Sequence, residues 1–318
     1  MIRRVLLAVA ATLAAVTLAA CSPLAAVNAV SPGGDSTAAE AISYGSGGRH
    51  MLDVYRPKTG AETRGGAPVI VFFYGGNWVS GERGDYAFVG RALAARGFVV
   101  VVPDYRLYPE VRYPDFLDDA AEAVAWTERH IAGYGGDPAK VFVMGHSAGA
   151  YNAAMVALDP RWLGKQGIQP GSLRGWIGLA GPYDFLPIEN PTTRPVFDFP
   201  DTRADSQPIR HAGDAGTKGP PALLIAAKKD SLVDPARNTA RLAGALRTAG
   251  VPVRELYYGG VNHYTLVASL SSSLRALAPT LDAVQAFVDD TIAPGGGAIV
   301  SQNLIGNGSG RRTSDPAR

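Results

Sequence analysis

A serine stands between an apolar run and a helix-forming run near the middle of the sequence. Residues 141–144 are apolar, Gly145-His-Ser-Ala-Gly149 follows them directly, and small residues such as Ala153 continue beyond it. A strand that turns straight into a helix holds its apex residue in a sparsely populated backbone conformation, and the residues two positions either side must be small. The pattern predicts that Ser147 is this apex, with its hydroxyl exposed beside a helix N-terminus as a nucleophile.

A serine hydroxyl is a poor nucleophile unless a general base takes its proton, and that base needs an acid to orient it. The sequence contains five histidines. His263 follows an expected strand at residues 253–258, which places it at the same edge of the sheet as Ser147. We therefore predict His263 as the base, with His211 as the alternative. Three others are expected not to act as the base: His50, His130 and His146.

The acid must also follow a strand at this edge. Asp230 comes directly after the apolar run 222–227, and it is predicted to orient the imidazole. Asp184, which follows the preceding expected strand, is the alternative. Asp234 lies further along and is expected to cap the helix that starts at Pro235.

Nucleophilic attack on a carbonyl also requires backbone N–H donors where negative charge develops. Phe72-Phe-Tyr-Gly-Gly-Asn-Trp78 ends an expected strand, and its two glycines let the backbone approach a substrate closely. We predict the N–H groups of Gly76 and Asn77 as donors, joined by that of Ala148 next to the nucleophile.

These residues need a scaffold that brings strand ends together. Apolar runs alternate with helical patterns along the chain, which favours an α/β fold with a mostly parallel sheet flanked by helices and sites at the carboxyl ends of the strands. Residues 182–219 break the alternation and are expected to form a short excursion over the sheet. The eight expected strands lie at residues 41–44, 51–56, 68–73, 98–103, 141–144, 173–180, 222–227 and 253–258.

The composition excludes several other classes of protein. The 318 residues include 30 basic and 28 acidic side chains, a near balance that argues against a nucleic-acid-binding surface. One cysteine excludes an intramolecular disulfide and a metal site built from several cysteines. Neither a metal nor an organic cofactor is implied.

That cysteine closes a leader-like segment. Residues 1–4 are basic, residues 5–20 are largely apolar, and Leu18-Ala-Ala-Cys21 ends the run. The layout is typical of a signal peptide, and it resembles the bacterial lipobox, in which cleavage leaves the cysteine for lipidation. The alternatives are an ordinary secretory signal and an uncleaved anchor, although about 20 apolar residues are needed to span a bilayer. We predict lipidation at Cys21 and a membrane-anchored location in the bacterial cell envelope.

The composition also predicts how the chain is divided. Residues 1–21 are expected to be the lipoprotein signal peptide, and residues 22–41 a flexible tether because they are rich in Ala, Ser, Pro and Gly. The catalytic domain is expected over residues 42–293. Residues 294–318 are expected to form a disordered tail.

Several motifs together resemble the α/β-hydrolase superfamily. They are Tyr74-Gly-Gly-Asn-Trp78, Asp104-Tyr-Arg-Leu-Tyr-Pro109, Tyr113-Pro-Asp-Phe116, Gly135-Gly-Asp-Pro138 and Gly145-His-Ser-Ala-Gly149. The chain is similar to the bacterial carboxylesterase and lipase group with an H-G-G-x-W oxyanion loop, whose relatives include feruloyl and acetyl esterases, kynurenine formamidases and prenylcysteine methylesterases. The resemblance runs from Ile42 to Ile292. Tyr74 stands where this group usually has His, which bears on the geometry of the loop.

The resemblance implies the α/β-hydrolase fold and a Ser…Asp…His order of catalytic residues, which Ser147, Asp230 and His263 follow. It also implies a serine hydrolase that cleaves small carboxylic esters through an acyl-enzyme intermediate. Two alternatives remain open: an amide hydrolase of the arylformamidase type, and a non-catalytic surface-binding lipoprotein on a hydrolase scaffold.

Overall fold

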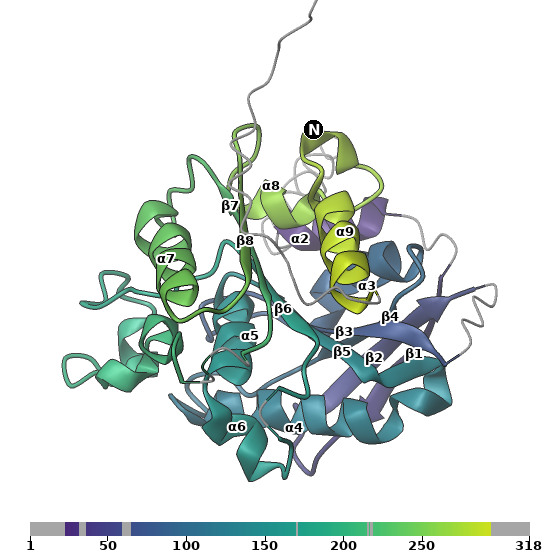
Figure 1. Cartoon of the computed structure of the whole chain (residues 1–318), viewed down its shortest axis with the longest axis horizontal. Coiled ribbons are helices and arrows are strands. Elements are labelled where there is room, and N and C mark those ends of the chain that lie inside the picture. The colour runs from purple at the N-terminus through teal and green to yellow at the C-terminus, as the bar shows by residue number, and fades with distance from the viewer. Residues whose placement is uncertain are drawn as a thin grey trace, which may run out of the picture.

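The central sheet confirms the predicted fold class. A computed structural model describes residues 23–31, 36–58, 65–169, 171–214, 216 and 219–293. Within these residues eight strands form one sheet in the order β1-β2-β4-β3-β5-β6-β7-β8 (Figure 1). The β1–β2 and β2–β4 pairs are antiparallel, and every other neighbouring pair is parallel. The strands are β1 (Ser36–Ser43), β2 (Met51–Pro57), β3 (Ala67–Phe73), β4 (Val99–Pro103), β5 (Gly136–His146), β6 (Gly175–Leu179), β7 (Ala222–Ala227) and β8 (Val253–Tyr258).

Helices cover both faces of this sheet. In Figure 1, α3 and α9 lie on one face, while α4, α5 and α7 lie on the other. Three strands between these layers, β4, β6 and β7, are buried along their whole length, as expected for strands covered on both sides. The helices are α2 (Pro23–Val30), α3 (Ala87–Ala94), α4 (Asp115–His130), α5 (Ala148–Leu158), α6 (Pro160–Lys165), α7 (Arg241–Thr248), α8 (His263–Ala268) and α9 (Thr280–Ile292).

Short helical turns connect these elements. The 3₁₀ turn η1 (Arg83–Tyr86) precedes α3, and the π-helical turn η7 (Ala236–Ala240) precedes α7. The other 3₁₀ turns are η2 (Ile131–Tyr134), η3 (Arg194–Phe197), η4 (Ala204–Ser206), η5 (Pro208–His211) and η8 (Arg275–Leu277).

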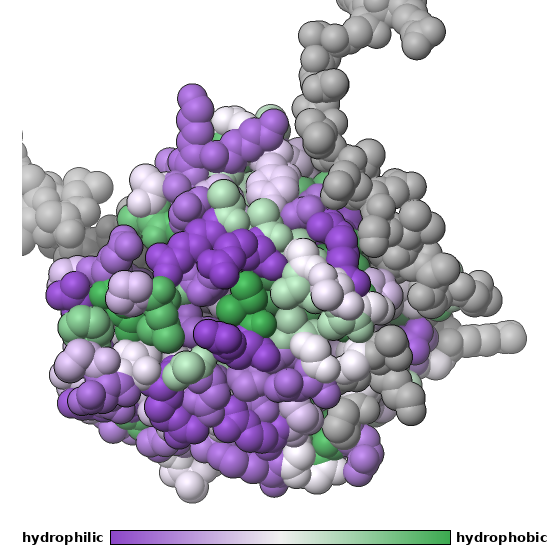
Figure 2. Space-filling view, turned by 60° about the vertical axis from the view of Figure 1, so that its left-hand side comes forward, coloured by the Kyte–Doolittle hydropathy of each residue, from purple (hydrophilic) through white to green (hydrophobic). Residues whose placement is uncertain are grey.

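The excursion at residues 182–219 packs through aromatic side chains against the loop that follows β3. Phe197 is buried and meets Trp78 edge to face, with 4.9 Å between ring centroids, and Phe185 stacks on Trp78 at 6.3 Å. Phe199, in contrast, is 40% exposed and lies under the guanidinium of Arg194. On the face formed by α7 and this excursion, hydrophobic residues appear as small separate patches among hydrophilic ones (Figure 2).

The predicted tether over residues 22–41 is wrong where the structure describes it. Residues 23–30 form α2, and β1 extends the predicted hairpin strand back to Ser36. Leu24 is buried in the core, and Arg91 Nη2 donates to the backbone carbonyls of Asn28 and Ser31 at 3.1 Å. These contacts come from distant parts of the chain, so a composition typical of linkers does not reveal them.

The predicted signal peptide and C-terminal tail lie outside the described residues. Cys21 therefore lies outside as well. Among the residues that the structure does describe, no helix is both long and apolar enough to cross a membrane.

Candidate active site

The turn between β5 and α5 holds Ser147 in a strained conformation. Its φ of 55° and ψ of −122° lie in a region that costs a non-glycine residue about 1–3 kcal/mol. A Cβ atom added to Gly145 would lie 2.1 Å from the Gly149 carbonyl oxygen, and one added to Gly149 would lie 2.0 Å from that of Phe73. Strand, turn and helix therefore approach so closely that only glycine fits on either side of the serine.

Asp230 and His263 form a hydrogen-bonded pair beyond the ends of β7 and β8. Asp230 Oδ2 lies 2.8 Å from His263 Nδ1, and Asp230 Oδ1 accepts from the N–H groups of Leu232 and Val233 at 2.9 and 3.0 Å. Burial raises the pKa of the Asp230 carboxyl, but the hydrogen bond and charge of His263 and the two N–H groups outweigh burial and lower it overall. The ionised carboxylate only accepts, so His263 carries a proton on Nδ1 and its Nε2 is free to take another.

His263 is the first residue of α8, the short helix that follows β8. Asn262 precedes it, and its side-chain oxygen accepts from the N–H groups of Tyr264 and Thr265 at 3.1 and 2.9 Å. Thr265 Oγ1 accepts in return from the Asn262 N–H at 2.8 Å, which completes a capping box. The Asn-x-x-Thr spacing was the sequence signal for this helix start, and it fixes the backbone that carries the imidazole.

His146, the residue before Ser147, contacts His263 of this pair. The His146 and His263 ring centroids are 4.9 Å apart, and His146 Nε2 lies 3.0 Å from the His263 carbonyl oxygen. The Ser147 hydroxyl makes no hydrogen bond to any described residue. Catalytic hydrogen bonds of a nucleophile are often long in free enzymes and shorten when substrate binds.

The side chains considered as the alternative base and acids form hydrogen bonds or ion pairs with other residues. His211 Nδ1 pairs with Asp214 at 2.6 Å, and its Nε2 lies 2.7 Å from the Asp205 carbonyl oxygen. Asp184 forms an ion pair with Arg241. Asp234 accepts a hydrogen bond from the Ala236 N–H at 2.9 Å, which agrees with its predicted capping role. None of these three side chains forms a hydrogen bond with Ser147 or His263, although Asp234 lines the pocket over Ser147.

The loop after β3 has the backbone expected of an oxyanion-binding loop. Gly76, Asn77 and Trp78 have φ values of 141°, 52° and 58°, an unusual run of positive angles that includes two non-glycine residues. Within the described chain the N–H groups of Gly76 and Asn77 donate to no backbone or side-chain acceptor, and Ala148 begins α5. All three predicted donors therefore remain available to a developing oxyanion.

Tyr74, where the resemblance leads us to expect His, is held from three sides. Its ring stacks on that of Tyr105 at 4.6 Å, and its carbonyl oxygen accepts from the Tyr105 hydroxyl at 2.7 Å. Arg49 Nη2 donates to the Tyr74 hydroxyl at 2.6 Å and to the Gly81 carbonyl oxygen at 2.8 Å. Arg49 thus anchors the loop through Tyr74, which the sequence alone does not reveal because Arg49 lies in the distant hairpin.

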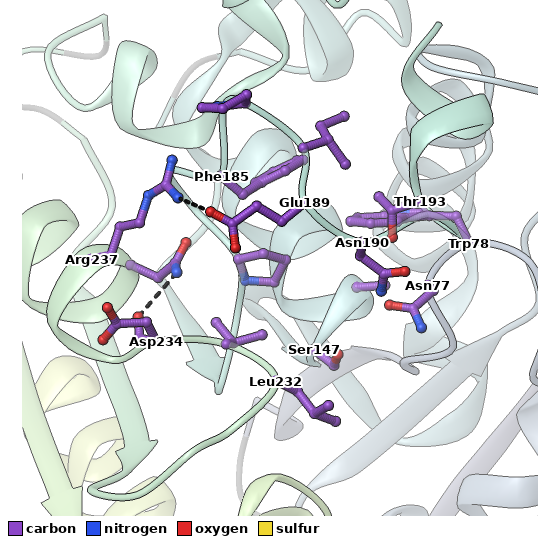
Figure 3. A pocket seen from close by; sticks show the side chains of 16 residues that line it. Asn77, Trp78, Ser147, Phe185, Glu189, Asn190, Thr193, Leu232, Asp234 and Arg237 are labelled. Carbon is purple, nitrogen blue, oxygen red and sulfur yellow. Dashed lines mark hydrogen bonds and ion pairs between the residues drawn. The ribbon is translucent and has the colours of Figure 1, made fainter. Parts of the chain in front are cut away.

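A pocket of about 160 Å³ opens over Ser147. Asn77, Trp78 and Leu232 line the part near the serine, and residues of the excursion together with Val233, Asp234, Arg237 and Asn238 line the remainder. Figure 3 shows the Glu189 carboxylate directed toward the Arg237 guanidinium, across the pocket from Ser147; the two charged groups are 3.8 Å apart. Of the three excursion phenylalanines, only Phe185 lines this pocket. The described residues contain no cluster of His, Cys, Asp or Glu that could hold a metal ion.

Comparison with known proteins places this arrangement in a wider context. A family described as having an alpha/beta hydrolase fold matches residues 70–267. A "Probable isoprenylcysteine alpha-carbonyl methylesterase" of Oryza sativa is 27% identical over 82% of this chain and 68% of that protein. A "Probable carboxylic ester hydrolase" of Mycobacterium tuberculosis is 31% identical over 79% of this chain and 61% of that protein.

Solved structures give the same comparison. The crystal structure of a thermostable esterase from Pseudomonas putida has a TM-score of 0.65 and 27% identity, over 86% of this chain and 93% of that chain. The chain spans only 36% of the length of another curated relative, an isoprenylcysteine alpha-carbonyl methylesterase-like protein of rice.

We predict that Asp230→Asn lowers turnover on the order of 10⁴-fold, because the amide stabilises the wrong tautomer of His263. Asp234→Asn is the matched control: this carboxylate lines the pocket and accepts from the Ala236 N–H but makes no hydrogen bond to His263, so the change is expected to alter turnover little. Steady-state kinetics with an activated ester measure both. If Asp184→Asn were the crippling change and Asp230→Asn were not, the acid would be the residue after β6.

His146 predicts an acid-sensitive stability. Burial, reinforced by the neighbouring charge of His263, lowers its pKa to about 3, whereas a histidine in an unfolded chain titrates near pH 6.5. Between these values only the unfolded chain binds the proton, so the free energy of unfolding falls as the pH decreases below 6.5. From about pH 7 to about pH 5 this one group contributes a loss of about 2 kcal/mol.

Urea unfolding of the wild type and of His146→Gln at both pH values measures this contribution. The wild type should lose about 2 kcal/mol more than the variant, because glutamine does not titrate. Equal losses in the two proteins would show that His146 does not bind its proton preferentially in the unfolded chain.

Proposed function

The chain belongs to the alpha/beta hydrolase family, and from that premise we propose that it hydrolyses carboxylic esters through a covalent acyl-enzyme. The observation that carries the proposal is the buried Asp230–His263 pair, 2.8 Å between Nδ1 and Oδ2, beside the strained turn that presents Ser147. Curated relatives and solved structures with esterase names support the same reaction class.

The proposed reaction has two halves. His263 Nε2 takes the proton of Ser147 as its oxygen attacks the ester carbonyl, and it then delivers that proton to the departing alcohol. Water attacks the acyl-enzyme in the second half, and His263 removes a proton from the water and returns it to Ser147. Asp230 remains ionised throughout and stabilises the imidazolium that forms twice in each cycle.

The backbone N–H groups of Gly76, Asn77 and Ala148 are proposed to bind the oxyanion of both tetrahedral intermediates. Loss of one such donor typically costs about 10²–10³-fold in turnover. The strained loop after β3 contributes here because its donors are oriented before the substrate arrives, so no reorganisation is needed during the reaction.

The dimensions of the pocket favour small substrates. A volume of about 160 Å³ is below the roughly 300–1,000 Å³ of sites that enclose drug-sized ligands. The apolar part near Ser147 suits a short acyl chain, and the Glu189–Arg237 side of the pocket offers polar contacts. We therefore expect short-chain esters to be better substrates than long-chain esters.

A fluorophosphonate probe and a series of p-nitrophenyl esters test the proposal. The probe should label the wild type once, at Ser147, and acetate and butyrate esters should be hydrolysed with higher kcat/KM than the palmitate ester. Ser147→Ala should lose labelling and lower turnover by roughly 10⁶-fold.

An aryl formamide measured in parallel distinguishes the amide-hydrolase alternative. Faster turnover of the formamide than of any ester would replace esters by formamides as the substrate class. Absence of both labelling and turnover in folded protein would instead leave a non-catalytic role on a hydrolase scaffold.

We further propose that the protein is attached to a bacterial membrane through lipid on Cys21, as the Leu-Ala-Ala-Cys ending of the leader suggests. The described chain begins two residues later with α2, which packs against η1, α3 and α8. Because α8 begins with His263, a lipid at this end of the chain would hold the active site close to the membrane surface. Stable anchoring requires more than one acyl chain, since a single chain binds only marginally.

Cys21→Ser is expected to prevent lipidation and to move the protein from the membrane fraction to the soluble fraction of cells. Fractionation with immunoblotting, together with the intact mass of the purified protein, measures both effects. The lipoprotein proposal would be contradicted if the wild type kept its whole leader and the Cys21→Ser variant stayed in the membrane fraction.

A further inference from the structure

Two buried side chains outside the proposed triad connect all three parts of the active site. The Gly75 N–H lies 3.2 Å from the Tyr86 hydroxyl, and that hydroxyl lies 3.2 Å from His146 Nδ1. His146 Nε2 lies 3.0 Å from the carbonyl oxygen of His263. Tyr86 and His146 are 3% and 1% exposed, so water does not compete for these hydrogen bonds.

The direction of every hydrogen bond in this series, from Gly75 through Tyr86 and His146 to His263, follows from the groups at its two ends. A carbonyl oxygen only accepts, so His146 must carry its proton on Nε2 and donate it to His263. Nδ1 of the neutral ring is then an acceptor, and the Tyr86 hydroxyl donates to it. The same hydroxyl oxygen keeps a lone pair free for the Gly75 N–H, which can only donate. All groups are satisfied in one arrangement, and that arrangement requires a neutral His146.

The neutral form persists while the active site changes its charge. Burial, followed by the neighbouring charge of His263, lowers the pKa of His146 to about 3, so the ring stays uncharged when His263 is protonated. Beyond the hydrogen bonds, the Tyr86 ring packs against Tyr74, with 5.9 Å between centroids, and against His146 at 6.2 Å. The hydrogen-bonded series from Gly75 to His263 is therefore a rigid buried unit.

The hydrogen-bonded series from Gly75 to His263 passes beside each proposed reacting group. Gly75 immediately precedes the proposed oxyanion donor Gly76, His146 immediately precedes Ser147, and the accepting carbonyl belongs to His263 itself. We propose that Tyr86 and His146 are positioning residues that fix the oxyanion loop and His263 relative to Ser147. The inference rests on the proposed esterase function. A displacement of about 1 Å between reacting groups can cost 10²-fold in rate, so these bonds affect turnover without contacting the substrate.

Tyr86→Phe is the first test, because it keeps the ring and removes only the hydroxyl that joins Gly75 to His146. Tyr257→Phe is the matched control, since it also removes a hydrogen-bonded phenolic hydroxyl. The Tyr257 hydroxyl donates to Glu255 at 2.7 Å and takes no part in the hydrogen bonds that join Gly75 to His263. Reactive sites are counted by fluorophosphonate titration, and kcat and KM for p-nitrophenyl butyrate are expressed per reactive site. This count separates a loss of turnover from a loss of folded protein.

We expect Tyr86→Phe to lower kcat per reactive site between about 10-fold and 100-fold, with KM unchanged, because the substrate pocket is intact while the reacting groups are displaced. The control should keep the kcat and KM of the wild type. Tyr86→Phe with the kcat of the control would overturn the inference.

Replacement of His146 provides a second, independent readout. Gln offers one donor and one acceptor, as neutral histidine does, whereas Leu offers neither. We expect His146→Leu to lower kcat per reactive site at least as much as Tyr86→Phe, and His146→Gln to recover a large part of that loss. Equal kcat values in the Gln and Leu variants would contradict a role through hydrogen bonding.

The outcomes also separate this inference from the proposed function. If the wild type hydrolysed no ester and took up no probe, the esterase proposal itself would fail. If the wild type were active and labelled while both sets of variants matched the control, only the positioning role would be lost.

Discussion

The structure depends above all on the close approach of three backbone segments at the turn before α5. Gly145 and Gly149 have no side chains, so β5, the start of α5 and the end of β3 meet at distances that any Cβ atom would prevent. This contact forces Ser147 into its strained conformation and also sets the loop after β3 directly beside it. The proposed nucleophile and the proposed oxyanion donors are thereby fixed relative to each other by the backbone, before any side chain contributes.

Around this turn, charge is distributed unequally between two neighbouring histidines. His263 is hydrogen-bonded to an ionised aspartate, whereas His146, one residue from Ser147, is buried without a carboxylate partner and stays neutral. The two rings lie only 4.9 Å apart, so this difference arises from the groups that immediately surround each ring. Because the His146 ring stays neutral, the hydrogen-bonded frame around the site keeps one arrangement.

The N-terminal part of the chain contributes to this frame from outside the sheet. Arg49, in the hairpin between β1 and β2, holds Tyr74 at the base of the oxyanion loop, and α2 packs against both η1 and α8. η1 carries Tyr86 and α8 begins with His263, so α2 supports two of the elements joined by the buried hydrogen-bonded chain. This N-terminal segment, residues 23–31 and 36–49, is therefore part of the scaffold of the candidate site.

Local pattern was enough to predict the eight-stranded α/β fold and the positions of Ser147, Asp230 and His263 beyond strand ends, because apolar runs and glycine spacing act over a few residues. Other features were decided by contacts between distant residues. Residues 22–41 have the composition of a tether, yet α2 and β1 form because Arg91 and β2 bind them. Phe185, Phe197 and Phe199 look equivalent in sequence, but one lines the pocket, one is buried and one is exposed. Likewise, Tyr86 and His146 carry no motif that marks them as partners. Only folding brings Gly75, Tyr86, His146 and His263 within hydrogen-bonding distance, and the satisfaction of buried polar groups then determines their arrangement.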